Sequence, residues 1–276
     1  MDLFVIILHT LLVSFIELMY LVGVLIGIGL VVGIIERYIH TFLIRAFGPR
    51  GVYITAWIGT PIHEIGHLLM CFIWGHRVTR VRLLQFRNTN GTLGFVEHQY
   101  NPNNLFQQIG NFFIGMGPIF SGIGALIAGM YVFTPKSFAM FTEYIHQSVT
   151  LEGVELASLR IVFYAFVALC KSLFMFDNIL NPWFWIYLII AICISSHTAL
   201  SFADIKGATK GLLAIFVFLF FVNIISRLIG VDSFHFFMIL AKYNAYVLAF
   251  SSITLLFSLL AVIVSYFLYI VKMKIM

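Results

Sequence analysis

The chain has 276 residues, of which 62% are hydrophobic and only 10% are charged. Its mean hydropathy of +1.04 is far outside the range of a soluble globular domain. The formal net charge is +5, but the basic residues are spread over loops and termini, as expected near the anionic lipid of a bilayer. The composition predicts a multi-pass integral membrane protein and excludes a nucleic-acid partner.

Apolar stretches long enough for a crossing of roughly 20 residues recur along the chain. They predict an all-α polytopic membrane protein with about six to seven transmembrane helices. We expect one integral-membrane domain over residues 1–276, because the sequence contains no repeat, linker or soluble domain. The candidate stretches are approximately 3–35, 52–74, 105–133, 154–176, 183–201, 208–230 and 244–271.

The second stretch carries the motif His63-Glu64-Ile65-Gly66-His67. In a helix, residues four apart share a face, so His63 and His67 can offer two imidazole nitrogens to one zinc ion. Glu64 then reaches the zinc-activated water as a general base. Ionisable groups in hydrocarbon are unfavourable unless they face a cavity and bind something, which favours a zinc hydrolase over a purely structural polar cluster.

The character of the sequence changes after this helix. Residues 76–84 alternate polar and apolar side chains, as strands do. Asn90-Gly91 is a turn signal, and residues 93–96 follow as a second strand. The sequence predicts a short β-hairpin directly after the zinc-binding helix. The alternative is a solvated basic loop whose arginines contact lipid headgroups.

The next apolar stretch contains Gly117-Pro118-Ile119-Phe120-Ser121. Together with the zinc motif and the hairpin, this element resembles the site-2 protease family of intramembrane zinc metalloproteases, whose corresponding motif is Gly-Pro-Leu-Ala-Asn. The resemblance covers a metalloprotease-like core of about residues 52–210. It implies a substrate-binding role for Ser121, although a serine replaces the family's asparagine and has a shorter reach.

A catalytic zinc needs three protein ligands and one open position. The resemblance implies an aspartate from a Leu-Asp-Gly element as the third ligand, and Asp204 in the stretch 203–207 matches it best. His197 is the competing ligand, or otherwise a residue of the substrate cavity. If residues 197–204 were helical, the two side chains would lie about 10 Å apart along the axis, too far to share one ion. The structural alternative for Asp204 is a solvated loop charge beside Lys206.

The resemblance implies an intramembrane zinc endopeptidase that hydrolyses a peptide bond in or near a transmembrane segment of a membrane-protein or peptide substrate. We expect it in the bacterial cytoplasmic membrane. The hairpin would bind an unwound substrate by strand addition. Because no soluble sensor domain is recognisable, we also expect control by a regulatory membrane partner or by prior trimming of the substrate.

The main alternative is a divalent-metal transporter, because zinc transporters also carry His-Glu-x-x-His on a membrane helix. Their signature usually has proline at the position of Gly66 and an acidic residue at the position of Leu68. A di-iron oxygenase would need several histidine-rich clusters. A catalytically inactive zinc-binding scaffold is a further alternative.

Overall fold

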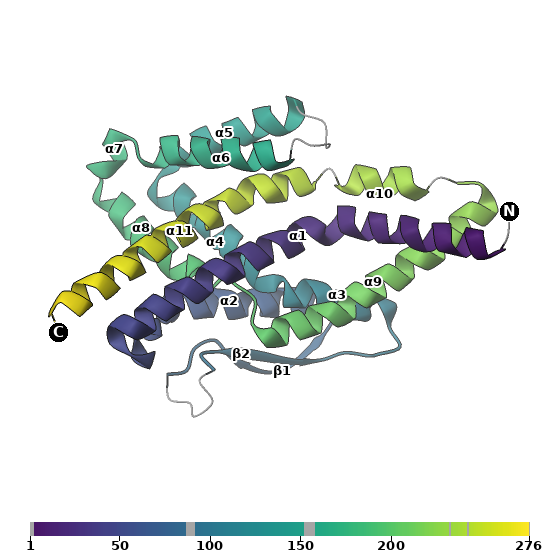
Figure 1. The fold of residues 1–276 in the computed structure, drawn as a ribbon, viewed down its shortest axis with the longest axis horizontal. Coiled ribbons are helices and arrows are strands. Elements are labelled where there is room, and N and C mark those ends of the chain that lie inside the picture. The colour runs from purple at the N-terminus through teal and green to yellow at the C-terminus, as the bar shows by residue number, and fades with distance from the viewer. Residues whose placement is uncertain (1–2, 87–91, 152–157, 232, 242, 276) are drawn as a thin grey trace.

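Helices form most of the chain, and one pair of short strands interrupts them (Figure 1). The computed structural model describes residues 3–86, 92–151, 158–231, 233–241 and 243–275. In chain order the elements are α1 (Leu3–Phe47), η1 (Pro49–Val52), α2 (Tyr53–Ile73), β1 (Arg77–Arg82), β2 (Phe95–Gln99), α3 (Leu105–Gly115), α4 (Gly117–Phe133), α5 (Pro135–Leu151), α6 (Ser158–Leu173), α7 (Phe176–Ile179), α8 (Pro182–Ser195), α9 (Phe202–Ile229), α10 (Ser233–Ala241) and α11 (Asn244–Ile275).

Three of the described helices, α1, α9 and α11, are long and apolar enough to cross a membrane. The pair α3 and α4 meets the same criterion together, but the two helices are bent by 55° at the break between them. The described residues therefore contain three candidate spans, or four if the bent pair is one span. The expectation of about six to seven transmembrane helices is wrong in number.

The missing spans are too short or too polar. Helices α6 and α8 have 16 and 14 residues, and 14 residues reach only about 21 Å, less than the roughly 30 Å of a hydrocarbon core. Helix α8 follows the cap residue Asn181 and ends at Ser195, before the end of the predicted stretch 183–201. Helix α2 has 21 residues, but the ionisable motif in its middle lowers its hydropathy. Apolar composition alone overestimated the number of crossings.

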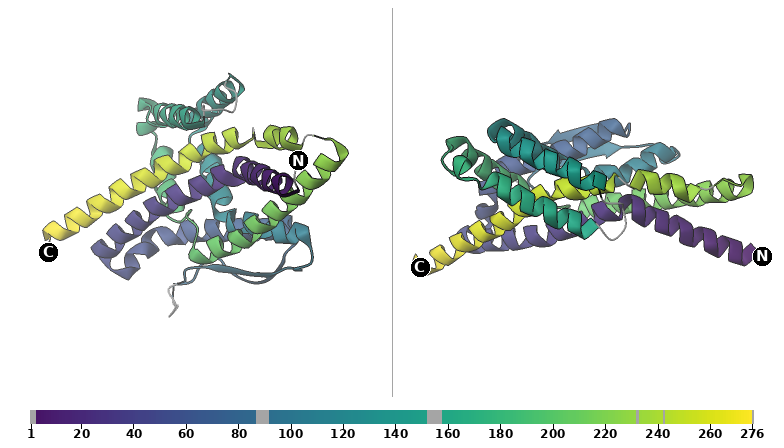
Figure 2. Two further views of the ribbon diagram at one scale, coloured as in Figure 1. Left: turned by 45° about the vertical axis from the view of Figure 1, so that its right-hand side comes forward. Right: turned by 90° about the horizontal axis from the view of Figure 1, so that it is seen from above.

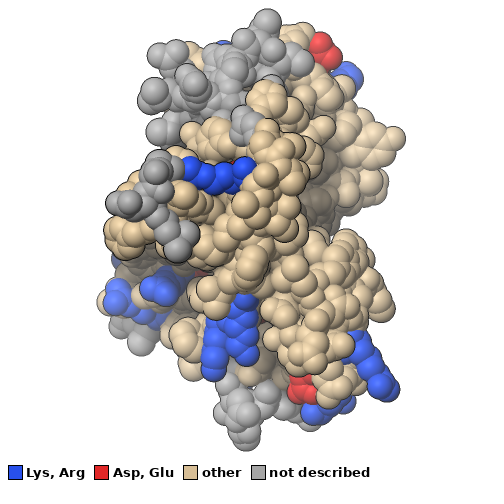
Figure 3. Space-filling model, turned by 90° about the vertical axis from the view of Figure 1, so that its right-hand side faces the viewer, with Lys and Arg blue, Asp and Glu red and all other residues tan. Residues whose placement is uncertain are grey.

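The outer surface supports a membrane location. Large apolar side chains on the candidate spans are exposed, including Leu228 (80%), Phe267 (65%) and Phe221 (57%). On the face drawn in Figure 3, uncharged residues cover most of the described surface and the basic residues form isolated groups. Soluble monomers rarely expose large apolar patches. These surfaces and the three long apolar helices indicate a membrane protein.

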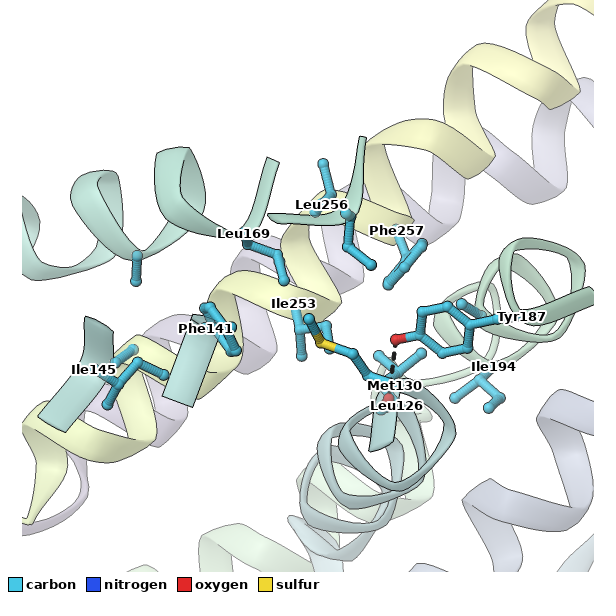
Figure 4. Packing of buried hydrophobic residues seen from close by; sticks show 14 of the residues in the cluster. Leu126, Met130, Phe141, Ile145, Leu169, Tyr187, Ile194, Ile253, Leu256 and Phe257 are labelled. Atoms are coloured by element: carbon cyan, nitrogen blue, oxygen red, sulfur yellow. Dashed lines mark hydrogen bonds between the residues drawn. The ribbon is translucent and has the colours of Figure 1, made fainter. Parts of the chain in front are cut away.

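The long helices α1 and α11 pack side by side through the middle of the molecule (Figures 1 and 2). One buried cluster joins α11 to α4, α5, α6 and α8 (Figure 4). Within it the buried Tyr187 hydroxyl donates a hydrogen bond of 2.9 Å to the carbonyl of Leu126, so its polar end is satisfied. A second cluster joins α1, α3, α4 and α9. This second packing arrangement positions the N-terminus of α9 near α2.

The strands confirm the predicted hairpin. β1 and β2 pair antiparallel, with Arg77 opposite Gln99 and Arg82 opposite Phe95, and the register shifts between Val78 and Arg80. Its predicted turn at Asn90-Gly91 lies outside the described residues. The hairpin contacts α2 and lies on the opposite side of the helices from α5 and α6 (Figure 1).

Two histidines attach the hairpin to the helices. His76 Nε2 lies 2.8 Å from the carbonyl of Gln107, and His76 Nδ1 lies 2.9 Å from His98 Nδ1. His76 Nε2–H therefore donates to Gln107, and His98 Nδ1–H donates to His76. Burial, reinforced by the charge of His76, lowers the pKa of His98 from 6.5 to about 4, and burial also lowers the pKa of His76. Both rings are neutral in this arrangement.

This contact makes stability sensitive to acid. Because the pKa of His98 is lower in the folded protein, the unfolded chain binds the proton more readily. The contribution of neutral His98 to the free energy of unfolding is fully present above pH 6.5 and is lost as the pH falls toward about 4. In thermal unfolding in detergent, the melting temperature of His98→Asn should fall less over this pH interval than that of the wild type. The asparagine amide can replace Nδ1 as a hydrogen-bond donor without titrating. The exposed His9→Asn control should behave like the wild type. Equal losses in all three proteins would contradict this assignment.

Candidate metal centre

The centre begins with two histidines on one face of α2. His63 and His67 are one helical turn apart, and their Nε2 atoms lie 3.2 Å from each other. Two nitrogens that each lie about 2.0–2.1 Å from a tetrahedral metal ion are about 3.4 Å apart. The side chains therefore already have the separation that a shared ion requires.

Asp204 supplies a third donor from the first turn of α9. Its Oδ1 lies 3.1 Å from His67 Nε2, and its Oδ2 lies 3.5 Å from His63 Nε2. A capping box holds the carboxylate, because the Ser201 N–H donates to Oδ2 at 2.7 Å and the Ser201 hydroxyl accepts from the Asp204 N–H. His63, His67 and Asp204 together could hold a metal ion.

Main-chain carbonyls orient both imidazoles. His63 Nδ1–H donates to the carbonyl of His197 at 2.9 Å, and His67 Nδ1–H donates to the carbonyl of Ile114 at 2.7 Å. A proton on Nδ1 leaves Nε2 with a free lone pair directed toward Asp204. This pattern is typical of metal-ligating histidines, whose second nitrogen is fixed by an outer hydrogen bond.

Glycines bring the three backbones close enough for this geometry. A methyl group on Gly66 would lie 2.5 Å from Ser121 Oγ, and one on Gly117 would lie 2.6 Å from the carbonyl oxygen of Gly66. A methyl group on Gly115 would lie 2.5 Å from the carbonyl oxygen of Asp204. Only glycine permits these approaches of α4 to α2 and of α3 to α9. The Gly-Pro motif therefore packs against α2, beside the candidate metal donors.

The centre opens into a cavity of about 490 Å³. Residues 92–96 form one wall of this cavity, together with His98. Gly94 packs directly on Glu64, since a methyl group there would lie 2.9 Å from Glu64 Oε1. Glu64 also lines the cavity and is only 6% exposed. Its carboxylate is not one of the three grouped donors, so it remains available for proton transfer beside them.

The structure separates the other two predicted site residues from the three donors. The Ser121 hydroxyl donates to the carbonyl of Ile62 at 2.7 Å, and Ser121 is not among the residues that line the cavity. His197 lines the cavity, but its ring Nε2 lies 2.9 Å from Thr55 Oγ1. Residues 196–201 form a loop and not a helix, which allows His197 to contact His63 through its carbonyl while Asp204 faces the same ring.

Sequence reasoning missed several polar residues of the cavity. Asn111, Thr60, Glu36 and His40 line it, and the first two are buried. Asn111 donates from Nδ2 to carbonyls of its own helix, which leaves its Oδ1 as an acceptor. The only sequence signal for these residues was their polarity within apolar stretches.

The donor set of two imidazoles and one carboxylate suits a divalent transition metal. Comparison with protein-family models, with curated proteins and with solved structures yields no match.

Asp204→Ala should remove one of three ligands. After equilibrium dialysis of the full chain against Zn²⁺, this variant should hold one zinc ion fewer than the wild type, because two imidazoles alone bind weakly. Asp177→Ala, which removes an exposed carboxylate on α7, should bind as the wild type does. Elemental analysis of the dialysed protein measures both. An unchanged zinc content in Asp204→Ala would exclude this carboxylate as a ligand.

Proposed function

We propose that this chain is an intramembrane zinc metalloprotease, which hydrolyses a peptide bond in or near a transmembrane segment of a membrane-protein substrate. One observation carries the proposal. His63, His67, Asp204 and Glu64 share one cavity, and an edge strand forms a wall of that cavity. The resemblance to the site-2 protease family agrees with this arrangement.

Zinc is the proposed ion because it accepts nitrogen and oxygen donors in a tetrahedral set with an open position. When bound, it supplies Lewis acidity that polarises the scissile carbonyl and activates water. His63 and His67 present Nε2, and their carbonyl acceptors at His197 and Ile114 keep them in that orientation. Asp204 completes the set from α9.

Glu64 is the proposed general base. It follows the ligand His63 directly in α2, lines the cavity, and lies outside the donor group. Its carboxylate takes the proton of the attacking water and passes it to the leaving amine. Burial of Glu64, which is only 6% exposed, keeps the carboxylate basic enough for this transfer.

Strand β2 is the proposed substrate platform. It pairs with β1 along one edge, and its residues Phe95, Val96 and His98 line the cavity together with the segment 92–94 that leads into it. An extended substrate segment could add to the free edge, where its scissile bond would lie beside Glu64 and the zinc ligands. Strand addition suits a transmembrane substrate because a helix must unwind before its peptide bonds become accessible.

Glu64→Gln tests the general base. The variant should retain zinc, since Glu64 is not a ligand, and should cleave a reconstituted single-span substrate about 10²–10⁴-fold more slowly. Glu143→Gln is a matched control, because Glu143 is an exposed carboxylate on α5 outside the cavity. Near-normal cleavage by Glu64→Gln would contradict the assignment. Proteoliposomes that move zinc and cleave nothing would support the transporter instead.

Gly94→Ala tests the substrate platform. The added methyl group would lie 2.7 Å from Glu64 Cγ and 3.0 Å from the Arg82 carbonyl, so the segment that leads into β2 must shift away from the site. Cleavage should fall about 10–100-fold, as expected for a misplacement near 1 Å, with zinc content unchanged. Gly124→Ala in α4, which meets no atom within 4 Å, is the control. Unchanged cleavage by Gly94→Ala would place the substrate elsewhere.

A further inference from the structure

A second group of potential metal donors lies in the same cavity. Glu36 and His40 are four residues apart on α1, and His197 belongs to the loop between α8 and α9. One donor atom from each residue lies within 4.8 Å of the donor atoms of the other two. None of these residues belongs to the group of His63, His67 and Asp204.

Main-chain contacts hold this group in place. Glu36 Oε2 accepts a hydrogen bond of 2.8 Å from the Ala199 N–H, and His40 Nε2–H donates one of 3.1 Å to the Ser196 carbonyl. The ring nitrogen of His40 that remains free to bind an ion is therefore Nδ1. The rings of His40 and His197 have centroids 5.2 Å apart. Helix α1 is thereby attached to the loop that precedes Asp204.

The second oxygen of Glu36 lacks a comparable partner. Oε1 lies 4.0 Å from His40 Nε2, and among the described residues no lysine or arginine forms an ion pair with Glu36. Glu36 lies in a helix that is long and apolar enough to cross a membrane. A carboxylate in such a helix normally pairs with a cation or another polar group. A divalent ion would supply the missing positive charge.

The cavity gives an ion and its water access to this group. Glu36, His40 and His197 all line it. The Thr60 hydroxyl lines it as well, and this side chain is only 5% exposed and lacks a hydrogen-bond partner among the described residues. A buried, unpaired hydroxyl beside a polar cavity indicates that water or a ligand belongs there.

We propose that Glu36, His40 and His197 form a second divalent-metal site. Two imidazoles and a carboxylate are the donor types of the first centre, and they suit Zn²⁺. Donors around a tetrahedral ion are about 3.4 Å apart, so the present spread of up to 4.8 Å would close by small side-chain rotations. This inference does not depend on peptidase activity.

His197 connects the two sites. Its ring would bind the second ion, whereas its carbonyl accepts the hydrogen bond from His63 Nδ1. The second ion would fix the loop between α8 and α9 against α1, and so would fix the acceptor that orients His63. Such outer contacts typically change metal affinity about 10–100-fold. The second site is therefore a positioning site for the first.

Zinc stoichiometry tests the proposal. After removal of metal and dialysis of the full chain against Zn²⁺, the wild type should bind two ions, and Glu36→Gln and His40→Ala should each bind one. Glu36→Gln retains an oxygen acceptor for the Ala199 N–H, so it should fold normally. His9→Ala, which removes an exposed histidine of the same helix, should bind two. Thermal unfolding of the metal-free proteins checks that each variant is folded.

Co²⁺ substitution identifies which ion is lost. Glu36→Gln should lose the absorption bands of the second site and keep those of the first, and Asp204→Ala should do the reverse. The double variant should show neither set. A wild type that binds one ion, or a Glu36→Gln that binds as many as the wild type, would overturn the second site. Loss of one ion in Glu36→Gln with no loss in Asp204→Ala would support the second site and contradict the metal centre on which the peptidase proposal rests.

Discussion

The structure depends on one constraint, which is that ionisable side chains within an apolar helical bundle must find partners among themselves or in the main chain. His63 and His67 meet this requirement with carbonyls at Nδ1, and their Nε2 atoms face Asp204, with which they could share a metal ion. Asp204 meets it with its capping box. Each partner also fixes an orientation, so the interactions that make these groups tolerable in the bundle also preorganise the metal donors.

Close backbone packing allows those partners to meet. The short separation between Gly66 and Gly117 brings α4 against α2, and Gly115 brings the end of α3 against the start of α9. Because α3 ends where α4 bends away by 55°, the Ile114 carbonyl remains available to His67. Small residues at helix contacts are common in membrane proteins, where close van der Waals packing replaces hydrophobic association. Here they also determine the shape of the cavity.

The hairpin gives the cavity a wall that differs from the helical walls. A helix has used its main-chain hydrogen bonds internally, whereas a strand edge can bind another backbone. Gly94 places this edge against Glu64. A transport site needs metal donors and a path for the ion but has no need of an exposed strand edge, so the hairpin supports the proposal of a peptide substrate. The group of Glu36, His40 and His197 enlarges the polar region on the side of α1.

The sequence by itself determined the local features: the apolar character of the chain, the pair of histidines with Glu64, and the hairpin, because these depend on composition and on spacings of a few residues. It left the third ligand open between Asp204 and His197, and it overestimated the membrane crossings. Tertiary structure groups Asp204 with His63 and His67 as potential metal donors, and it contains fewer candidate spans than expected. The loop over residues 196–201 breaks the apolar run and turns the His197 carbonyl and the Asp204 carboxylate toward the same imidazole. The association of α1 with that loop was equally inaccessible from sequence, since contacts between residues far apart in the chain leave no local periodicity.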